Sequence, residues 1–286
     1  MGRRNPRTAP PPTAQRQVGA RGAVNFAEIP VVILCGGMGA RLREETDALP
    51  KPLLKVGGIP ILVHIMNHYS HFGFRKFVLC IGYCGFMIKE YFLNLAYHLS
   101  DFTLTLVDAK ENVVEFHNWQ PRGWQITFAE TGLTTETGAR IKRVEKYVST
   151  PHFMATYGDG LSDVPLDTLY RHHVESGAVA TMTGIQMRTR FGVIEADSGG
   201  LVRSFREKDK VTDTINGGFF AFSREIFDYL AADSVLEAEP FQRLVKDGRM
   251  RVFRHRGFWQ CMDTYKELTL LNDMAAAGHT PWILKA

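Results

Sequence analysis

The chain lacks any uninterrupted apolar run of about 18 residues, the length that a membrane-spanning helix needs. Near its amino terminus Arg3 and Arg4 are adjacent, but no apolar segment follows them. This stretch therefore has the pattern of neither a secretory nor a twin-arginine signal. We expect a cytoplasmic protein that has no membrane partner.

Cysteine is scarce, with four residues in 286 and no CxxC pair. Three of the four (Cys35, Cys80, Cys84 and Cys261) lie in apolar surroundings, which is typical of small core side chains in a reducing compartment. Zinc ligation by Cys80 and Cys84 is an alternative, but further ligands at suitable spacing are missing.

The folded body lacks a basic excess. Residues 1–28 hold five arginines and one glutamate, and this difference equals the formal charge of +4 of the whole chain. The rest is neutral, so we expect no nucleic-acid partner. Residues 1–28 are rich in Pro, Ala, Arg and Gly and are predicted to be a disordered basic tail ahead of one domain, 29–286.

Strand and helix patterns alternate from residue 29 onward. Continuous apolar strands separated by amphipathic helices favour an α/β fold with a mixed, mainly parallel central sheet and helices on both faces. This domain would consist of two halves, about 29–165 and about 166–286. Expected strands are 31–35, 76–82, 102–107, 124–130, 153–159, 178–185, 191–195, 201–207 and 215–222; expected helices are 60–72, 85–99, 139–148, 166–177, 223–231, 237–247 and 264–277.

One stretch, residues 108–123, interrupts this alternation. Its Val113, Val114, Phe116 and Trp119 are too apolar for a solvated loop. It covers either the active site or a neighbouring subunit, and we favour the subunit. The sequence thus predicts a homo-oligomer.

A glycine-rich turn follows the first strand. Gly36, Gly37 and Gly39 leave room for backbone N–H groups to approach a polyphosphate, and the cations Arg41 and Lys51 follow. A Walker A loop is excluded because no Lys-Ser or Lys-Thr follows, and GxGxxG fails at Leu42. The pattern favours a nucleotide-phosphate site over a plain turn.

Two carboxylates stand at element ends. Asp159 follows a strand in a Gly-Asp-Gly turn, and Asp263 precedes a helix, where it could simply be the N-cap.

Three histidines, His64, His68 and His71, share one helix face at metal-capable spacing, although a buried structural set is the ordinary interpretation. The cation Arg140, in the first turn of a helix, is oddly placed for the macrodipole and suggests a nearby anion or base edge.

The stretch Leu34–Ile61 resembles the signature of the sugar-1-phosphate nucleotidyltransferases, LxGGxGTRLxxxTxxxPKPLxxVxGxPI, with Ala40 in place of threonine. The likeness continues through HIMNHYSHFGF, CIGYCGFMIKEYF, TYGDGLSD, INGGFF and GFWQCMDT, and looks most like the glucose-1-phosphate cytidylyltransferases. The resemblance implies a Rossmann-like, GT-A-like nucleotidyltransferase fold, in which about 29–165 would be the nucleotide-binding half and about 166–286 the sugar-phosphate half.

The resemblance also implies site residues. Asp159 and Asp263 would hold one Mg²⁺, and the catalytic set would be Arg41, Lys51, Asp159, Lys208 and Asp263. The nucleotide would contact Leu34, Cys35, Gly36, Gly37, Met38, Gly39, Ala40, Arg41, Lys51, Thr135, Arg140 and Gly158. The sugar phosphate would contact Gly192, Glu207, Lys208 and Asn216.

The implied reaction is CTP plus α-D-glucose 1-phosphate giving CDP-glucose and pyrophosphate. The attacking sugar phosphate is already an anion, so no general base is required. Two alternatives stay open: the same transfer with another NTP or sugar 1-phosphate, and a catalytically silent nucleotide-sugar binding protein.

Overall fold

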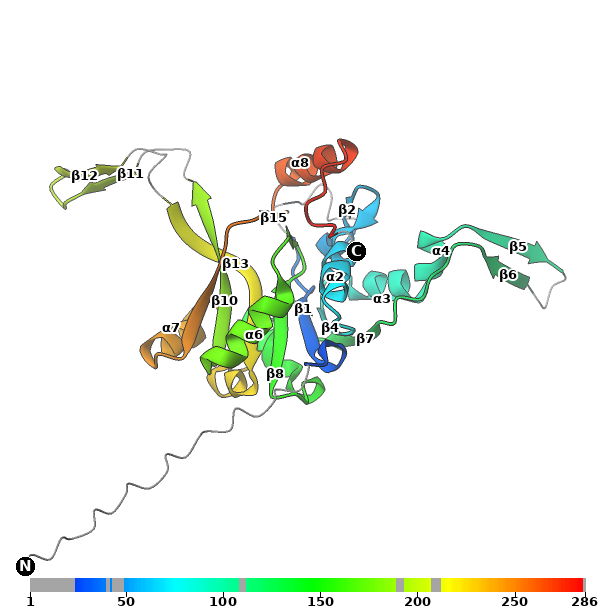
Figure 1. The fold of residues 1–286 in the computed structure, drawn as a ribbon, viewed down its shortest axis with the longest axis horizontal. Helices are drawn as coiled ribbons and strands as arrows, with labels where there is room; N and C mark the ends of the chain where they lie inside the picture. The colour runs from blue at the N-terminus through cyan, green and yellow to red at the C-terminus, as the bar shows by residue number, and fades with distance from the viewer. Residues whose placement is uncertain are drawn as a thin grey trace, which may run out of the picture.

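A computed structural model describes residues 24–39, 42, 49–107, 112–188, 193–206 and 212–284. Its centre is a seven-stranded sheet in the order β14-β10-β13-β8-β1-β4-β7 (Figure 1). The strands of this sheet are β1 Pro30–Leu34, β4 Lys76–Ile81, β7 Gln125–Glu130, β8 His152–Tyr157, β10 Ala180–Arg188, β13 Thr212–Ser223 and β14 Met250–His255.

The sheet is mixed and mainly parallel. Strand β1 pairs in parallel with both β4 and β8, β4 with β7, and β10 with β14, whereas β13 runs antiparallel to its neighbours β8 and β10. The predicted fold class is confirmed. Because β1 and β8 pair in parallel, the carboxyl ends of these two strands lie side by side, at the carboxyl edge of the sheet.

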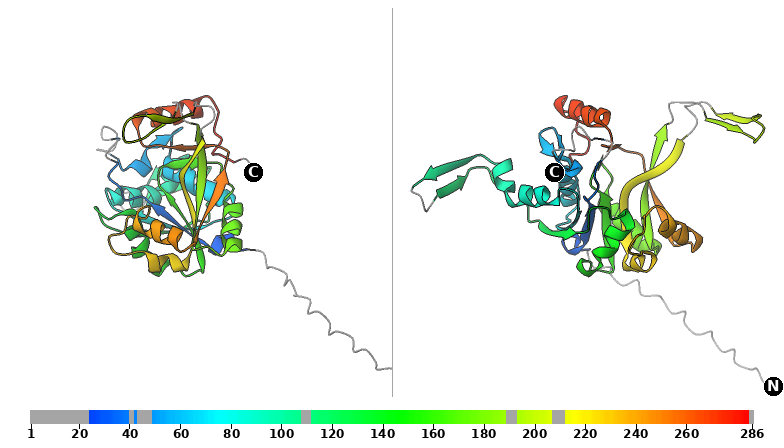
Figure 2. Two further views of the ribbon diagram at one scale, coloured as in Figure 1. Left: turned by 90° about the vertical axis from the view of Figure 1, so that its left-hand side faces the viewer. Right: turned by 180° about the vertical axis from the view of Figure 1, so that it is seen from behind.

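Side chains of the central strands alternate between two hydrophobic layers, as the period of two requires. Val31 and Ile33 pack in one layer, and Val32 packs in the other. The first layer is built with α2 Ile61–His71, α3 Gly85–Leu93, α6 Leu166–Ser176 and α8 Tyr265–Ala276, and the second with α5 Thr137–Arg143, η6 Arg224–Tyr229 and α7 Glu239–Lys246. Helices therefore cover both faces of the sheet (Figure 2).

The expected strand 102–107 does form, but its predicted place in the parallel sheet is wrong. Strand β5 Phe102–Leu106 pairs only with β6 Asn112–Phe116, as an antiparallel hairpin that stands away from the body (Figure 1). Strand β7 takes the place beside β4. All five residues of β5 are exposed, so local pattern alone did not reveal which partner the strand would find.

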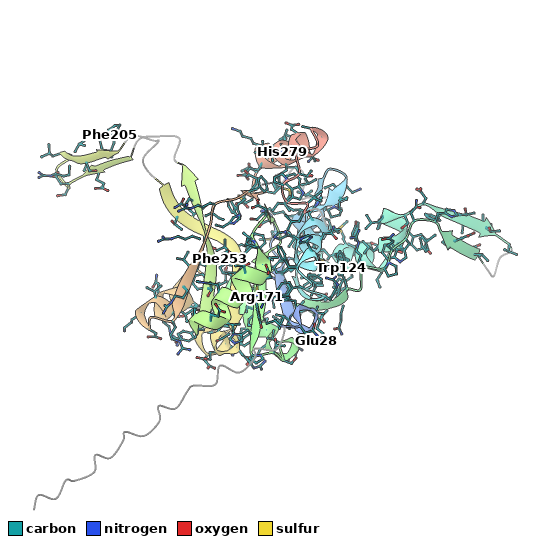
Figure 3. All side chains as sticks on the ribbon, viewed as in Figure 1. Glu28, Trp124, Arg171, Phe205, Phe253 and His279 are labelled. Atoms are coloured by element: carbon teal, nitrogen blue, oxygen red, sulfur yellow. The ribbon has the colours of Figure 1, made fainter. Side chains whose placement is uncertain are left out.

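A second hairpin, β11 Val193–Ala196 with β12 Val202–Arg206, projects on the other side of the molecule, and Figure 3 shows Phe205 on this hairpin. Short elements complete the fold: η1 Phe26–Glu28, η3 Lys51–Leu53, β2 Lys55–Val56, β3 Ile59–Pro60, α4 Leu95–Leu99, η4 Glu145–Tyr147, β9 Gly160–Ser162 and β15 Trp259–Cys261.

Three further expectations need correction. The single helix expected at 85–99 divides at Asn94 into α3 and α4, and the expected helix 223–231 is the 3-10 helix η6. Strand β14 was not expected. The folded domain includes residues before 29, because Phe26 packs against the rings of Phe74 and Tyr170. Residues 1–23 of the predicted tail lie outside the described residues.

Candidate active site

Three charged side chains meet at the carboxyl edge of the sheet. The Lys51 ammonium donates to Asp159 Oδ2 and to Asp263 Oδ1, each at 2.6 Å. The three residues are separated by 108 and 212 positions along the chain, so only the fold brings them together. Of the five residues expected to carry the chemistry, these three form one cluster, and Arg41 and Lys208 lie outside the described residues.

The two carboxylates are aligned by a short antiparallel ladder. Strand β9 pairs with β15, Cys261 lies opposite Gly160, and the Met262 amide donates to the Asp159 carbonyl at 2.9 Å. Asp263 follows directly and is not the N-cap of α8. That role belongs to Thr264, which forms a capping box with Glu267. The Asp263 carboxylate is therefore available to the site.

Glycine is required just before Asp159. The Gly158 amide donates to the Leu34 carbonyl at 3.1 Å, and a Cβ at this position would lie 2.9 Å from the same oxygen. The absence of a side chain lets the turn after β8 press against the end of β1. This contact fixes Asp159 beside the glycine-rich turn.

Lys51 stands on a stiff segment. Pro50 and Pro52 flank it, and Pro52 and Leu53 are buried. Burial acts to lower the pKa of Lys51, but the charge of Asp159 and the hydrogen bonds to both carboxylates outweigh it, so the pKa is raised. Lys51 is consequently an ammonium at neutral pH.

A pocket of about 140 Å³ opens beside the cluster. It is lined by Leu34, Cys35, Gly37, Gly39, Lys51, Pro52, Gly158 and Asp159. Small-molecule pockets usually measure about 300–1,000 Å³. This pocket is therefore large enough for only part of a nucleotide. Its glycine backbone and the Lys51 ammonium suit a phosphate group. Met38, also expected at the nucleotide, is 54% exposed, and Ala40 lies outside the described residues.

Arg140 lies beneath the glycine-rich turn. Its guanidinium donates to Thr131 Oγ1 and the Gly132 carbonyl, both at 2.7 Å, and to the carbonyls of Gly36 (3.0 Å) and Leu133 (3.2 Å). Arg140 is buried, and a Cβ on Gly36 would lie 2.1 Å from its Nη1. The cation thus has internal acceptors, and a direct contact with a base stays a prediction.

The helix macrodipole does not disfavour a cation at Arg140. Helix α5 has only seven residues, so its fourth residue lies as near the carboxyl end as the amino end. Thr135, the other residue expected near the base, lies close to the Gly132 backbone, because a Cβ on Gly132 would be 2.6 Å from its Oγ1. Arg140 thus adjoins the glycine-rich turn, and Thr135 adjoins the loop at Gly132.

We expect Arg140→Met to destabilise the protein by on the order of 3 kcal/mol. The change removes several charge-assisted hydrogen bonds, each worth about 1.5–3 kcal/mol, while water offsets part of the loss. Urea unfolding measures the effect. Arg143→Met is the matched control, because Arg143 is exposed and, among the described residues, donates a single hydrogen bond, to the Thr131 carbonyl. Equal unfolding free energies for the two variants would contradict the structural role of Arg140.

Asn216, expected at the sugar phosphate, lies on β13 and donates to the Tyr157 hydroxyl at 3.4 Å. Tyr157 in turn donates to Glu237. Sequence reasoning missed both partners. Tyr157 could have been noticed because it belongs to the TYGDG segment, whereas an isolated glutamate such as Glu237 carries no signal. Gly192, Glu207 and Lys208 lie outside the described residues.

Two of the three histidines that share a helix face have backbone partners. His64 Nε2 and His68 Nε2 each contact a backbone carbonyl at 2.9 Å, of Val56 and Val164 respectively. Among the residues that the structure describes, no three His, Cys, Asp or Glu side chains gather as a metal site. The described helices also include none with the length and apolar content of a membrane span.

Fold and site together define an enzyme of the nucleotidyl transferase class. A mainly parallel sheet presents a glycine-lined pocket, a lysine and two carboxylates at one edge. The sequence pattern of the nucleotidyl transferase family matches residues 30–260, and the chain belongs to that family.

The relatives above 40% identity are named as cytidylyltransferases. A protein of Bacillus subtilis (strain 168) named "Probable glucose-1-phosphate cytidylyltransferase" is 44% identical over 253 residues, which covers 88% of this chain and 98% of that protein. The glucose-1-phosphate cytidylyltransferase of Salmonella typhi is 41% identical over 254 residues, which covers 88% of this chain and 97% of the relative.

Solved structures share the fold at lower identity. HddC from Yersinia pseudotuberculosis is 20% identical with a TM-score of 0.60, and the match covers 86% of this chain and 98% of HddC. A complex of HddC with GMP-PN gives 21% identity and a TM-score of 0.59. At this identity the likeness concerns the fold alone.

Proposed function

We propose that this protein is a glucose-1-phosphate cytidylyltransferase, which transfers a cytidylyl group from CTP to α-D-glucose 1-phosphate and releases pyrophosphate. The structural observation that carries the proposal is the Lys51 ammonium, held at 2.6 Å from both Asp159 and Asp263 beside the glycine pocket. The relatives at 41–44% identity support the choice of substrates.

The attacking group, the sugar phosphate, carries negative charge without help from a general base. The second pKa of a phosphate monoester is about 6, so the sugar phosphate is mostly dianionic at neutral pH. The protein therefore has to align two anions and neutralise the charge that develops on pyrophosphate. The glycines of the pocket offer backbone N–H groups to the triphosphate, and Lys51 supplies a fixed positive charge next to it.

Asp159 and Asp263 are the residues that would hold Mg²⁺. Their carboxylate oxygens converge on one point, and hard oxygen donors are what this ion prefers. When bound, Mg²⁺ would neutralise phosphate charge and polarise the phosphorus–oxygen bonds. The Lys51 ammonium bridges both carboxylates, which supports the proposal that a positive charge binds between them.

The preference for CTP is supported by the relatives rather than by Arg140. The Nη donors of Arg140 have protein acceptors, so the structure offers no support for base recognition by this side chain. Arg140 and Thr135 would instead shape the loop and the turn that the nucleotide meets.

A matrix of four NTPs against several sugar 1-phosphates tests the proposal. We expect Mg²⁺-dependent pyrophosphate release to be fastest with CTP and glucose 1-phosphate, with CDP-glucose as the second product. Faster turnover with another NTP or another sugar 1-phosphate would identify that compound as the preferred substrate instead. If the protein releases no pyrophosphate with any pair but binds CDP-glucose, it is a catalytically silent binding protein.

We further propose that the enzyme is a homo-oligomer and that the β5–β6 hairpin contacts a second copy. An isolated two-stranded hairpin is at best marginally stable in water. This hairpin exposes apolar side chains on both of its faces, including Leu104, Leu106 and Val113, which are 49%, 72% and 56% exposed. An exposed apolar surface of this kind is typical of an interaction site.

The double substitution Leu104→Glu and Leu106→Glu is expected to lower the solution mass at least about twofold, because charges would be placed in the contact between copies. Size-exclusion chromatography with light scattering gives the mass. Val245→Glu on α7 is the control, since Val245 is 65% exposed on the body of the protein. A wild-type monomer, or an unchanged mass in the double variant, would refute the contact.

We also place the reaction in the cytoplasm. All four cysteines are free thiols, which supports a reducing compartment. Cys35 and Cys80 lie in neighbouring strand ends without forming a bridge, and burial raises the pKa of the Cys80 thiol to about 12. The Cys35 and Cys80 thiols are therefore protonated and serve as small core side chains.

A further inference from the structure

A chain of hydrogen bonds crosses the carboxyl edge of the sheet, beginning two residues before Asp159. The Tyr157 hydroxyl donates to one carboxylate oxygen of Glu237 and accepts from Asn216 Nδ2 at 3.4 Å. The second carboxylate oxygen of Glu237 accepts from Thr137 Oγ1 at 2.9 Å. Four side chains from α5, β8, β13 and the segment before α7 are thus connected into one bridge.

The Thr137 end of the bridge is held by several further contacts. Thr137 Oγ1 accepts from the Leu236 amide, and the Ala139 amide donates to the Ser234 carbonyl, both at 2.9 Å. A Cβ on Gly138 would lie 2.8 Å from the same Ser234 oxygen. The segment before α7 is therefore clamped to the start of α5 whether or not Tyr157 takes part.

The Asn216 end has fewer contacts. Asn216 Oδ1 accepts from the Gly218 amide at 2.9 Å, and its Nδ2 group contacts the Tyr157 hydroxyl. Without that hydroxyl the amide would lose the partner that directs its Nδ2 group. The orientation of Asn216 is therefore the property most sensitive to a change in the bridge.

The Tyr157 ring is fixed by packing. It meets the Phe220 ring edge-on, with centroids 5.6 Å apart, and it lies against Gly218. Gly218 has φ of +77°, and a Cβ there would be 2.4 Å from the Tyr157 ring. A phenol is protonated at neutral pH, so the Tyr157 hydroxyl can donate to the Glu237 carboxylate.

We propose that Tyr157 and Glu237 are positioning residues for the transfer: they hold Asn216, on the sugar-phosphate side, in a fixed orientation relative to the start of α5, on the nucleotide side. The inference rests on the proposed function. It assigns no contact with the reacting atoms to either residue. Their effect reaches the sugar phosphate through the Asn216 amide.

Kinetics of Tyr157→Phe, Glu237→Gln and the double variant test the inference, with pyrophosphate release as the assay. We expect each single change to raise KM for the sugar 1-phosphate about tenfold, since about 1.4 kcal/mol is lost with a hydrogen bond to a charged group. KM for the nucleotide should change less than about twofold. Because both changes break one bridge, the double variant should resemble the single ones.

Tyr229→Phe is the matched control, because the Tyr229 hydroxyl donates to Asp247 at 3.0 Å on an exposed part of η6. It should leave both KM values unchanged. Unchanged sugar KM in both single variants, or effects that multiply in the double variant, would overturn the proposal. A loss of thermal stability without a change in the ratio of the two KM values would also overturn it.

Hydrogen exchange gives a readout that needs no turnover. The Gly218 amide, bonded to Asn216 Oδ1, should exchange faster in substrate-free Tyr157→Phe than in wild type and Tyr229→Phe. Wild-type protein that releases no pyrophosphate would refute the proposed function, and the exchange rate would still decide whether the bridge orients Asn216. Equal exchange rates would contradict the bridge even in an active enzyme.

Discussion

Asp159→Asn is expected to lower kcat/KM for pyrophosphate release by at least about 100-fold, the scale found when one charge-stabilising group is lost from an active site. The carboxylate lies 2.6 Å from Lys51 and is fixed by the Gly158 turn, so the amide would keep the shape and lose the charge. Steady-state kinetics with saturating Mg²⁺ measures the loss.

The same variant should bind Mn²⁺, a spectroscopic substitute for Mg²⁺, more weakly in the absence of substrates. Asp163→Asn is the matched control: Asp163 lies four residues further on, and its carboxylate contacts His255 Nε2 at 2.7 Å rather than Lys51. Near-wild-type turnover of Asp159→Asn, or equal loss in the control, would remove Asp159 from the mechanism.

Lys51→Met should also reduce kcat/KM by at least about 100-fold, but with the opposite effect on metal binding. In the free enzyme the Lys51 ammonium neutralises Asp159 and Asp263. Without it the two carboxylates repel each other, because two unit charges about 4 Å apart near a protein surface interact by about 4 kcal/mol. A divalent cation relieves that repulsion, so Mn²⁺ should bind at least about tenfold more tightly.

Electron paramagnetic resonance of free Mn²⁺ gives this affinity independently of catalysis. Lys55→Met is the control, since Lys55 is exposed four residues away on the same segment. Weaker Mn²⁺ binding in Lys51→Met would show that the lysine does not occupy the position of the metal. Full activity would show that its charge is not needed for transfer.

Several features could be predicted from sequence because they depend on short-range chemistry. The apolar strand before Gly36 depends on neighbouring residues only, and the structure places it as expected. The fold class followed from the alternation of strands and helices, which is a local property repeated along the chain.

The errors arose where a strand depended on a distant partner. Strand β5 has the composition of a sheet strand, but it lies outside the central sheet and exposes both faces. Arg140 is a different case, because its contact with an anion or a base edge stays a prediction; its acceptors, the carbonyls of Gly36, Gly132 and Leu133, cannot be anticipated from spacing. The Tyr157–Glu237 contact joins residues 80 positions apart and left no local pattern.

By itself the sequence determined the family, the glycine-rich turn and the identity of the charged groups, because these are written in contiguous residues. Only the tertiary structure decided that one ammonium bridges carboxylates 108 and 212 positions away. The pairing of β15 with β9 and the close approach of Gly158 to Leu34 produce that meeting. Such contacts follow from packing of the whole sheet, for which no single segment carries the information.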